Sequence, residues 1–463
     1  MALVSSQLYR EVIEIASRGA KPVHFRYEIE IVANGKIHRS LGGVNYSILR
    51  NYLTNYADDA RVELLFPAGT FLYDILPYRR DLKARVYAYP LYENGENENR
   101  HAAPTVREWK AVPFDVDDQA VDQNQPAAQG KDAADISTMN RYTFQLLDPV
   151  TEMLRRQRIG GIYRNQTPGD LLRGLLTHYS LGLDFDLDKK PLGVGMIAPN
   201  NTERRQTFII PHARPLVDQP DGEYGLARYL QFVEGGIYNA GIASYYQGRH
   251  WYVFPPFDVT RYETASKRLT IANIPAKDMR QPERSYRVDG NSIYVLATGD
   301  VKYRDQSEHE QLNGGNGVRW SSPTKVFDGM LSGEGNRAQA NRSKVMSEIV
   351  GDKNPENLSH APMSAQPISS NSSAQMTPLA YRRGAIVQLA WENANIDILH
   401  PGMPVRLVYE RQKKIEQLDG VLIGAEFNAA PTGNLGAKEG WLTNAALTIF
   451  VARSSIDKTK NQA

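Results

Sequence analysis

The stretch RYTFQLLDPVTEMLRRQRIGGIYRNQTPGDLLRGLLTHYS, residues 141–180, decides the fold. It begins with a predicted β-strand, continues with a strand-like run, and ends in a predicted amphipathic helix. The helix has a well-marked start, because Thr167 can cap it, Pro168 suits the first helical position and Asp170 stands where a capping box places an acid. Its apolar residues recur at helical spacing, so one face should be buried: Leu171, Leu172, Leu175, Leu176 and Tyr179.

Length and composition indicate a globular protein with several domains. The 463 residues exceed what one core usually serves, so we expect two to four domains. The formal net charge of +2 does not indicate a dedicated nucleic-acid binder. The sequence has no cysteine, which excludes disulfides and thiolate chemistry. No apolar run is long enough to span a membrane, and residues 1–19 predict a short helix rather than a signal peptide.

Strand patterns dominate both ends of the chain. They predict an α+β, mainly β fold with two tube-like β-barrel or sheet domains, short helices and long polar insertions. The first tube-like domain is expected at residues 1–150, where Asn34-Gly35 predicts a tight hairpin turn. Its polar insertion at residues 93–140 is rich in acidic and amide side chains and is expected to form a loop or arm.

The rest of the chain divides by the same patterns. Four units are expected: a helix–strand insert at 151–220, a second tube-like β domain at 221–265 plus 380–455, a small β region at 266–304, and a flexible arm at 305–378. Short turns are predicted at Gln247-Gly248, Asp289-Gly290 and Gly299-Asp300.

One glycine-rich motif has the spacing of a dinucleotide-binding loop. Gly193, Gly195 and Ala198 form G-x-G-x-x-A, which binds phosphate only between a strand and a helix. Pro191 and Pro199 flank the motif and no helix can begin there, so we predict no dinucleotide site.

Three acids resemble the beginning of a calcium loop. Asp184, Asp186 and Asp188 alternate, but Lys189 replaces the required glycine and Gly195 stands where a bidentate acid is needed. A solvated strand face or a rim of acids explains them better.

No catalytic constellation is visible. The nine histidines include no H-E-x-x-H pair, and His178 and His250 are expected to pack against aromatic neighbours. No G-x-S-x-G elbow occurs, and nothing singles out a pair of carboxylates for glycoside cleavage. We therefore predict no catalytic, cofactor-binding or metal site, and a protein that is not an enzyme.

The densest basic run is RRQR at residues 155–158. Solvated faces or ion pairs explain such runs in most proteins. This run could also bind a neighbouring acidic subunit.

Three motifs carry a resemblance to a known family: T-P-x-D-L-L at 167–172, F-V-E-G-G-I-Y at 232–238, and P-G at 401–402. Their order and spacing resemble those of the baseplate hub proteins of contractile-tailed bacteriophages and the related N-terminal hub region of type VI secretion spike proteins. The likeness covers residues 21–258 and 401–453, and the two polar tracts fall outside it.

The resemblance implies a structural virion protein. Such hubs form homotrimers in which each subunit supplies two tube-like domains, so three subunits make a pseudo-hexameric ring. The ring would join the hexameric tail tube to the trimeric central spike, with the tape measure and baseplate wedge proteins as possible further partners. DNA would pass through the lumen without specific binding. The resemblance implies no cofactor, assembly in the host cytoplasm, and a final place in the tail baseplate.

The physical chemistry of open sheets agrees with such a ring. Two incomplete sheets per chain expose strand edges, which neighbouring subunits can cover. Two alternatives stay open. One is another β-rich tail component, such as a tail adaptor, neck or receptor-binding protein, and the less favoured one is a cell-wall-degrading enzyme.

Overall fold

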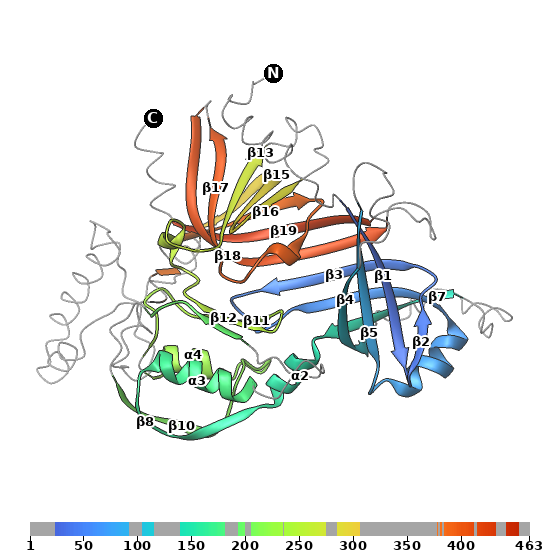
Figure 1. Cartoon of the computed structure of the whole chain (residues 1–463), viewed down its shortest axis with the longest axis horizontal. Coiled ribbons are helices and arrows are strands. Elements are labelled where there is room, and N and C mark those ends of the chain that lie inside the picture. Colours follow the sequence, from blue (N-terminus) through green and yellow to red (C-terminus); the bar gives the residue numbers. More distant parts are fainter. Residues whose placement is uncertain are drawn as a thin grey trace, which may run out of the picture.

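The computed structural model describes residues 24–91, 104–114, 139–180, 193–199, 205–234, 236–274, 285–305, 377, 380–381, 384–411, 414–431 and 441–452. Strands dominate this part of the chain and the helices are few and short, which confirms the predicted α+β, mainly β class (Figure 1). The predictions for residues 1–19, for the acids Asp184, Asp186 and Asp188, and for the arm up to residue 376 lie outside the described residues.

Fourteen strands form one large mixed sheet. In chain order they are β1 (His24–Ala33), β2 (Lys36–Arg39), β3 (Gly43–Asn51), β4 (Asp59–Pro67), β5 (Lys83–Leu91), β6 (Thr105–Pro113), β7 (Met139–Leu147), β13 (Arg268–Ile274), β14 (Tyr286–Asp289), β15 (Ser292–Asp305), β16 (Gly384–Glu392), β17 (Pro404–Arg411), β18 (Lys414–Pro431) and β19 (Trp441–Ala452). They pair in the order β13-β17-β18-β3-β4-β7-β6-β5-β1-β19-β16-β15-β14, with β2 on β1.

The hairpin of β18 and β19 belongs to two circuits of paired strands. The first circuit leads from β18 back to β19 through β3, β4, β7, β6, β5 and β1. The second circuit leads from β18 back to β19 through β17, β13, β15 and β16. The first circuit meets β19 through one register pair only, Phe25 with Trp441. Parallel pairs at β13 make the large sheet a mixed one, and taken as a whole it is not one closed barrel.

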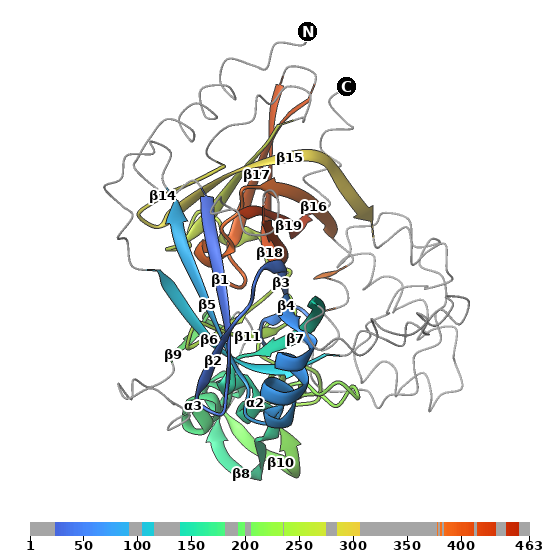
Figure 2. The same ribbon diagram turned by 90° about the vertical axis from the view of Figure 1, so that its right-hand side faces the viewer.

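Two small sheets and the helices form the opposite end of the molecule. The two-stranded sheet contains β8 (Arg158–Gln166) and β10 (Gln206–Pro215), and the three-stranded sheet contains β11 (Ala243–Gln247), β12 (His250–Phe254) and β9 (Gly193–Met196). The α-helices are α2 (Pro149–Arg156), α3 (Pro168–Ser180) and α4 (Leu226–Phe232). Single turns of other helix types are η1 (Thr70–Ile75), η2 (Leu76–Tyr78), η4 (Val259–Arg261) and η7 (Ile396–Ile398). Figures 1 and 2 both place α3, β8 and β10 far from β16 and β19. Within the described part of the chain, the helices are too short or too polar to cross a membrane.

The apolar interior has two main parts. The larger core runs through both circuits and includes Phe66, Phe144 and Phe427, each at most 2% exposed. The second core lies between the small sheets and the helices and includes Phe208 and Trp251. Burial of these side chains is the main favourable contribution to folding.

The polar tract at 93–140 contributes a strand. Residues Thr105–Pro113 form β6, which pairs with β5 and β7, so the expectation of a loop or arm is wrong for these residues. Trp109 and Ala111 are buried at alternate positions, and this short alternation was masked by the polar residues around it.

Two further local expectations need correction. The turn predicted at Gly299-Asp300 is absent because β15 runs through it, and a register shift between Thr298 and Lys302 takes its place. Glycine within a strand often marks such a bulge. The helix α2, which the sequence reading missed, begins where Asp148 accepts a hydrogen bond from the backbone N–H of Val150 at 2.8 Å.

Candidate functional site

The most extensive candidate surface is one face of a continuous antiparallel sheet. Its strands, in the order β7-β4-β3-β18-β19-β16, come from both ends of the chain. One face is buried, as on β4, where Ala60, Val62, Leu64 and Phe66 alternate with more exposed residues. This alternation is typical of an antiparallel sheet with one face in the core.

The opposite face carries two rows of cross-strand neighbours, which we call the wall face. The first row contains Arg61, Ser47, Asn428, Asn444 and Glu392, and the second contains Asp59, Leu49, Glu426, Ala446 and Ala390. Amides, hydroxyls and small side chains lie among the charged ones, which are one arginine and three carboxylates. Arg61 lies 3.9 Å from Asp59, and the wall face is a hydrated surface with a small negative charge. Among the described residues, no group of three or more His, Asp or Glu side chains could hold a metal ion.

Behind the wall face lies a buried cluster of charges, which we call the arginine junction. Arg50 projects from β3, and its side chain is fully buried. Its Nε and Nη2 donate to the carboxylate of Asp58 at 3.1–3.2 Å, and its Nη1 donates to the carbonyl of Ile396. The hydroxyl of Tyr245 also donates to Asp58, at 2.9 Å. The junction thus ties β3 to β11 and to η7.

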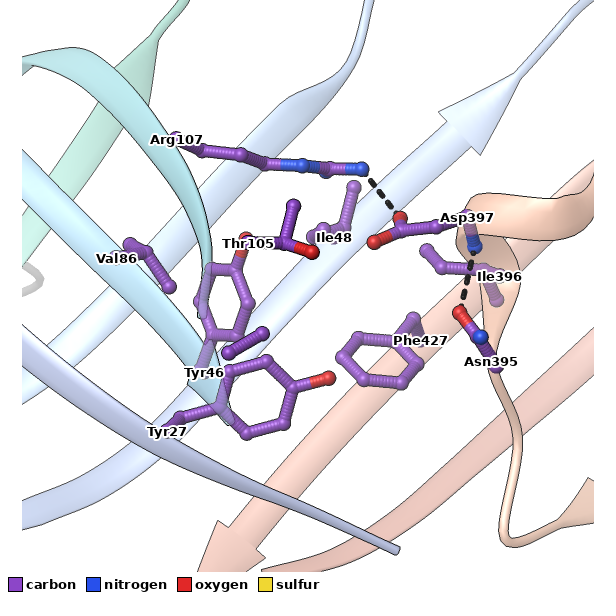
Figure 3. Close-up of a pocket in the computed structure, with 11 residues that line it drawn as sticks. Tyr27, Tyr46, Ile48, Val86, Thr105, Arg107, Asn395, Ile396, Asp397 and Phe427 are labelled. Atoms are coloured by element: carbon purple, nitrogen blue, oxygen red, sulfur yellow. Dashed lines mark hydrogen bonds and ion pairs between the residues drawn. The ribbon is translucent and has the colours of Figure 1, made fainter. Parts of the chain in front are cut away.

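A second ion pair extends the junction toward solvent. Asp397 lies 3.6 Å from Arg50 Nη2. It also pairs with Arg107 of β6, and Figure 3 shows this second pair. Desolvation opposes the charge on Arg50, but Asp58 and Asp397 outweigh it, so the pKa of Arg50 is raised above its ordinary value. Burial and the nearby Asp58 raise the pKa of Tyr245 in turn. The positive and negative side chains of the cluster therefore stay ionised and compensate one another.

A small cavity, with room for about one water molecule, opens beside the Arg107–Asp397 pair. Figure 3 shows the rings of Tyr27, Tyr46 and Phe427 on its other side, and the Tyr27 and Tyr46 rings lie 5.5 Å apart. Because the two charged groups at its mouth already neutralise each other, the cavity offers no unsatisfied charge to a ligand. Its contacts fit a structural junction better than a binding pocket.

His400 follows η7 and links the second circuit to the three-stranded sheet. Its Nδ1 lies 3.1 Å from the hydroxyl of Tyr252, and its Nε2 lies 3.2 Å from Nζ of Lys267. Burial, with Lys267 and Arg50 nearby, lowers the pKa of His400 to about 4. The ring is therefore neutral near pH 7, and because a lysine ammonium can only donate, Nε2 is the acceptor.

The motif at 167–172 forms the helix start that the sequence predicts. The backbone N–H of Asp170 donates to Oγ1 of Thr167 at 3.1 Å, so the predicted cap is confirmed. The four leucines of the apolar stripe are buried, and Tyr179 packs beside them. Their burial fixes α3 against the second core.

The motif at 232–238 is organised by a residue just before it, Gln231, whose side chain is fully buried. Its Oε1 accepts hydrogen bonds from the backbone N–H groups of Ile237 and Tyr238, and its Nε2 donates to the carbonyl of Tyr238 at 2.6 Å. Gly236 supports the turn with φ of 75°. A buried side-chain amide thus replaces the backbone bonds lost at the end of α4.

The glycine of the P-G motif at 401–402 is required for steric reasons. Gly402 has φ of 67°, and a Cβ atom there would lie 2.2 Å from the ring of Phe254. Only glycine fits, and β17 begins two residues later.

The remaining candidate residues have structural surroundings. Gly193 and Gly195 lie in β9, and Ala198 begins no helix. His178 lies edge-on to Tyr179, and His250 lies beside the ring of Tyr252.

The RRQR run is largely used within the chain. Arg156 pairs with Glu152 at 2.5 Å, and Arg158 pairs with Glu223 at 3.1 Å.

The sequence reading missed the arginine junction altogether. Arg50 and Ile396 are 346 positions apart, so no local pattern could indicate their contact.

No protein-family model and no curated protein sequence matches the chain. Similar solved structures include a tail protein from Neisseria meningitidis MC58, with 10% identity, 92% of this chain and 96% of that one covered, and a TM-score of 0.41. The 43 kDa tail protein of prophage MuSo2 from Shewanella oneidensis has 12% identity, with 91% of this chain and 96% of that one covered and a TM-score of 0.38. An E. coli protein has 10% identity, with 92% of this chain and 77% of that one covered and a TM-score of 0.38. That protein is described as a component of the type VI secretion system with structural similarity to T4 bacteriophage tail proteins gp27 and gp5.

The structural neighbours are thus phage tail proteins and spike-related proteins of type VI secretion, the two classes that the sequence motifs resemble. With TM-scores below 0.5 and identities of 10–12%, they do not by themselves assign a role to this chain.

Proposed function

We propose that the protein is a structural component of a contractile phage tail, the trimeric baseplate hub that joins the hexameric tail tube to the trimeric central spike. Its place would be the virion tail baseplate, after assembly in the host cytoplasm. Its partners would be two further copies of itself, the tube protein and the spike protein, with tape measure and baseplate wedge proteins as further partners. The role is one of scaffolding and not of catalysis.

The continuity of the wall face across both ends of the chain is the main support. A tube wall needs a sheet with one dry face, which holds it together, and one wet face, which lines a channel. The six strands have this character, with the core on one side and the rows through Ser47, Asn428 and Asn444 on the other. Neutral amides and hydroxyls, with few basic side chains among them, would let DNA pass without specific binding. The motifs at 167–172, 232–238 and 401–402 add support.

Assembly of the purified protein tests the proposal. Native mass spectrometry, alone and with tube and spike proteins, is expected to detect a trimer, and electron microscopy is expected to show a ring with a sixfold-like inner wall. A species that stays monomeric under all these conditions would refute the hub.

A thiol label tests which face lines the channel. The sequence has no cysteine, so Asn444→Cys introduces a unique attachment point for a maleimide-gold particle. The gold is expected inside the ring, and unsubstituted protein treated in the same way provides the blank. Gold on the outer rim would show that the wall face does not line the channel.

A further inference from the structure

The two-stranded sheet of β8 and β10 has one face in the second core and one face in solvent. Phe208 and Ile210 are at most 2% exposed on the inner face. On the outer face, Ile162 and Ile209 are directly paired across the strands and are 62% and 64% exposed. Two large aliphatic side chains in contact in water form an apolar centre that a partner can bury.

The charged residues of these two strands are all basic. The two strands contain four arginines, counting Arg205 next to β10, and no acidic residue. Arg158 and Arg214 at one end both pair with Glu223. Arg164 and Arg205 at the other end are exposed and form no ion pair within the described ranges.

Exposure and strand alternation place the relevant residues on the outer face, with Arg164 inside the register shift between Tyr163 and Gln166. Arg164 lies two positions from Ile162, and Arg205 and Thr207 precede Ile209 at two-residue steps. We call this set of five residues the ribbon face. It lies far from β18 and β19 in both views of the molecule (Figures 1 and 2), so it is separate from the wall face.

We propose that the ribbon face docks an acidic segment of a neighbouring protein, which covers Ile162 and Ile209 with apolar side chains and meets Arg164 and Arg205 with carboxylates. Charge complementarity selects this partner, because the strands offer only positive charge around an apolar centre. The inference does not depend on the role as a hub.

Other occupants fit the ribbon face less well. Stacking with nucleobases needs exposed rings, and Tyr163, the aromatic residue of β8, packs on the inner side. An anionic membrane surface is usually held by clusters of about four to eight basic residues, whereas two arginines are free of ion pairs in the described part of this face. Register shifts near both ends of the β8–β10 ladder also disfavour the addition of a strand at its edge, so docking uses the face.

A fluorescence titration tests the proposal. Thr207→Cys places a single environment-sensitive dye on the ribbon face, because the chain has no other thiol. The probe is a peptide of alternating aspartate and valine. We expect a saturable blue shift that weakens with added salt. A peptide of the same length, with proline at every third position, serves as the control ligand.

Variants identify the side chains responsible. In the Thr207→Cys background, Ile162→Ser with Ile209→Ser, and separately Arg164→Glu with Arg205→Glu, should each weaken peptide binding at least tenfold. The charge-reversed variant should instead bind a lysine–valine peptide, which a merely destabilised protein would not do. Arg80→Glu, at an exposed arginine elsewhere, should change nothing.

Several results would overturn the proposal. These are no shift with the acidic peptide at low salt, equal binding of the proline control, or an equal loss in Arg80→Glu. A response only to single-stranded DNA or to phosphatidylserine vesicles would assign the face to those ligands instead. Thermal unfolding of each variant verifies that it folds, which is expected because all the substituted side chains are exposed.

Discussion

The two circuits share a hairpin but are held together differently. The first is joined between β1 and β19 by one register pair, and its interior contains the arginine junction and the cavity beside it. The second is closed by ladders on every side, and apolar residues such as Leu269, Val295 and Val405 fill it. Apolar packing tolerates small errors of position, whereas buried charges require their partners. The first circuit therefore depends on distant parts of the chain, and the second depends mainly on its own side chains.

Removing a buried tryptophan from either circuit should cost the most stability. Trp391 of the second circuit is fully buried, and its Nε1 donates to Ser285 Oγ at 2.9 Å. Trp441 of the first circuit packs edge-on against Tyr27 and fills the space beside Gly43. Trp391→Ala should lower the free energy of unfolding by about 4 kcal/mol and Trp441→Ala by about 3 kcal/mol, as measured by urea denaturation.

Hydrogen exchange should distinguish the two tryptophan variants by region. Trp441→Ala should speed amide exchange chiefly in β1 and the start of β19, where a single register pair makes the join. Trp391→Ala should speed exchange throughout the second circuit. Uniform acceleration in both variants would show that the circuits unfold as one unit.

The next effect concerns the arginine junction. Arg50→Met leaves Asp58 buried without its cation and should lower the free energy of unfolding by about 3 kcal/mol. Arg85→Met is the matched control, since the Arg85–Glu108 pair is solvent-exposed and its loss should cost under about 0.5 kcal/mol. Similar losses in the two variants would contradict the central role given to the junction.

The pH dependence of stability should report on His400. Its pKa in the folded protein is lowered to about 4, while the unfolded chain has the ordinary value near 6.5. Between these values the unfolded state binds more protons, so stability is complete above pH 6.5 and falls as the pH drops toward 4. Urea titrations should show about 2 kcal/mol of this loss in the native protein and less in His400→Gln. An unchanged pH profile in the variant would assign the loss to other groups.

The smallest effect should leave both circuits untouched. Thr167→Ala removes the cap of α3 and should cost about 1 kcal/mol, while Thr167→Ser should cost little. Exchange should rise at the start of α3 only. A change in the exchange of β3 or β16 would mean that the helical end and the large sheet are coupled.

Local sequence patterns predicted many elements well. The turn at Asn34-Gly35, the cap at Thr167 and the alternation in β16 and β19 are recovered, because each depends on residues a few positions apart. The division into domains at the expected boundaries stays a prediction.

Long-range features could not be found in this way. The pairing of β18 with β3, and of Arg50 with Asp58 and Ile396, is decided by packing between segments distant in the chain. In β6, polar neighbours hid a short buried alternation, and in β15 a glycine that reads as a turn is accommodated as a bulge. These errors arise where tertiary contacts outweigh local preference.

One strand has a consequence for how this protein can be rearranged by recombination. β18 spends its first half beside β17 and its second half beside β3, so it passes without a break from one circuit into the other. A hybrid chain that takes one half of β18 from each of two parents would therefore combine foreign side chains in both cores at once. Such hybrids should fold less well than hybrids joined in a surface loop.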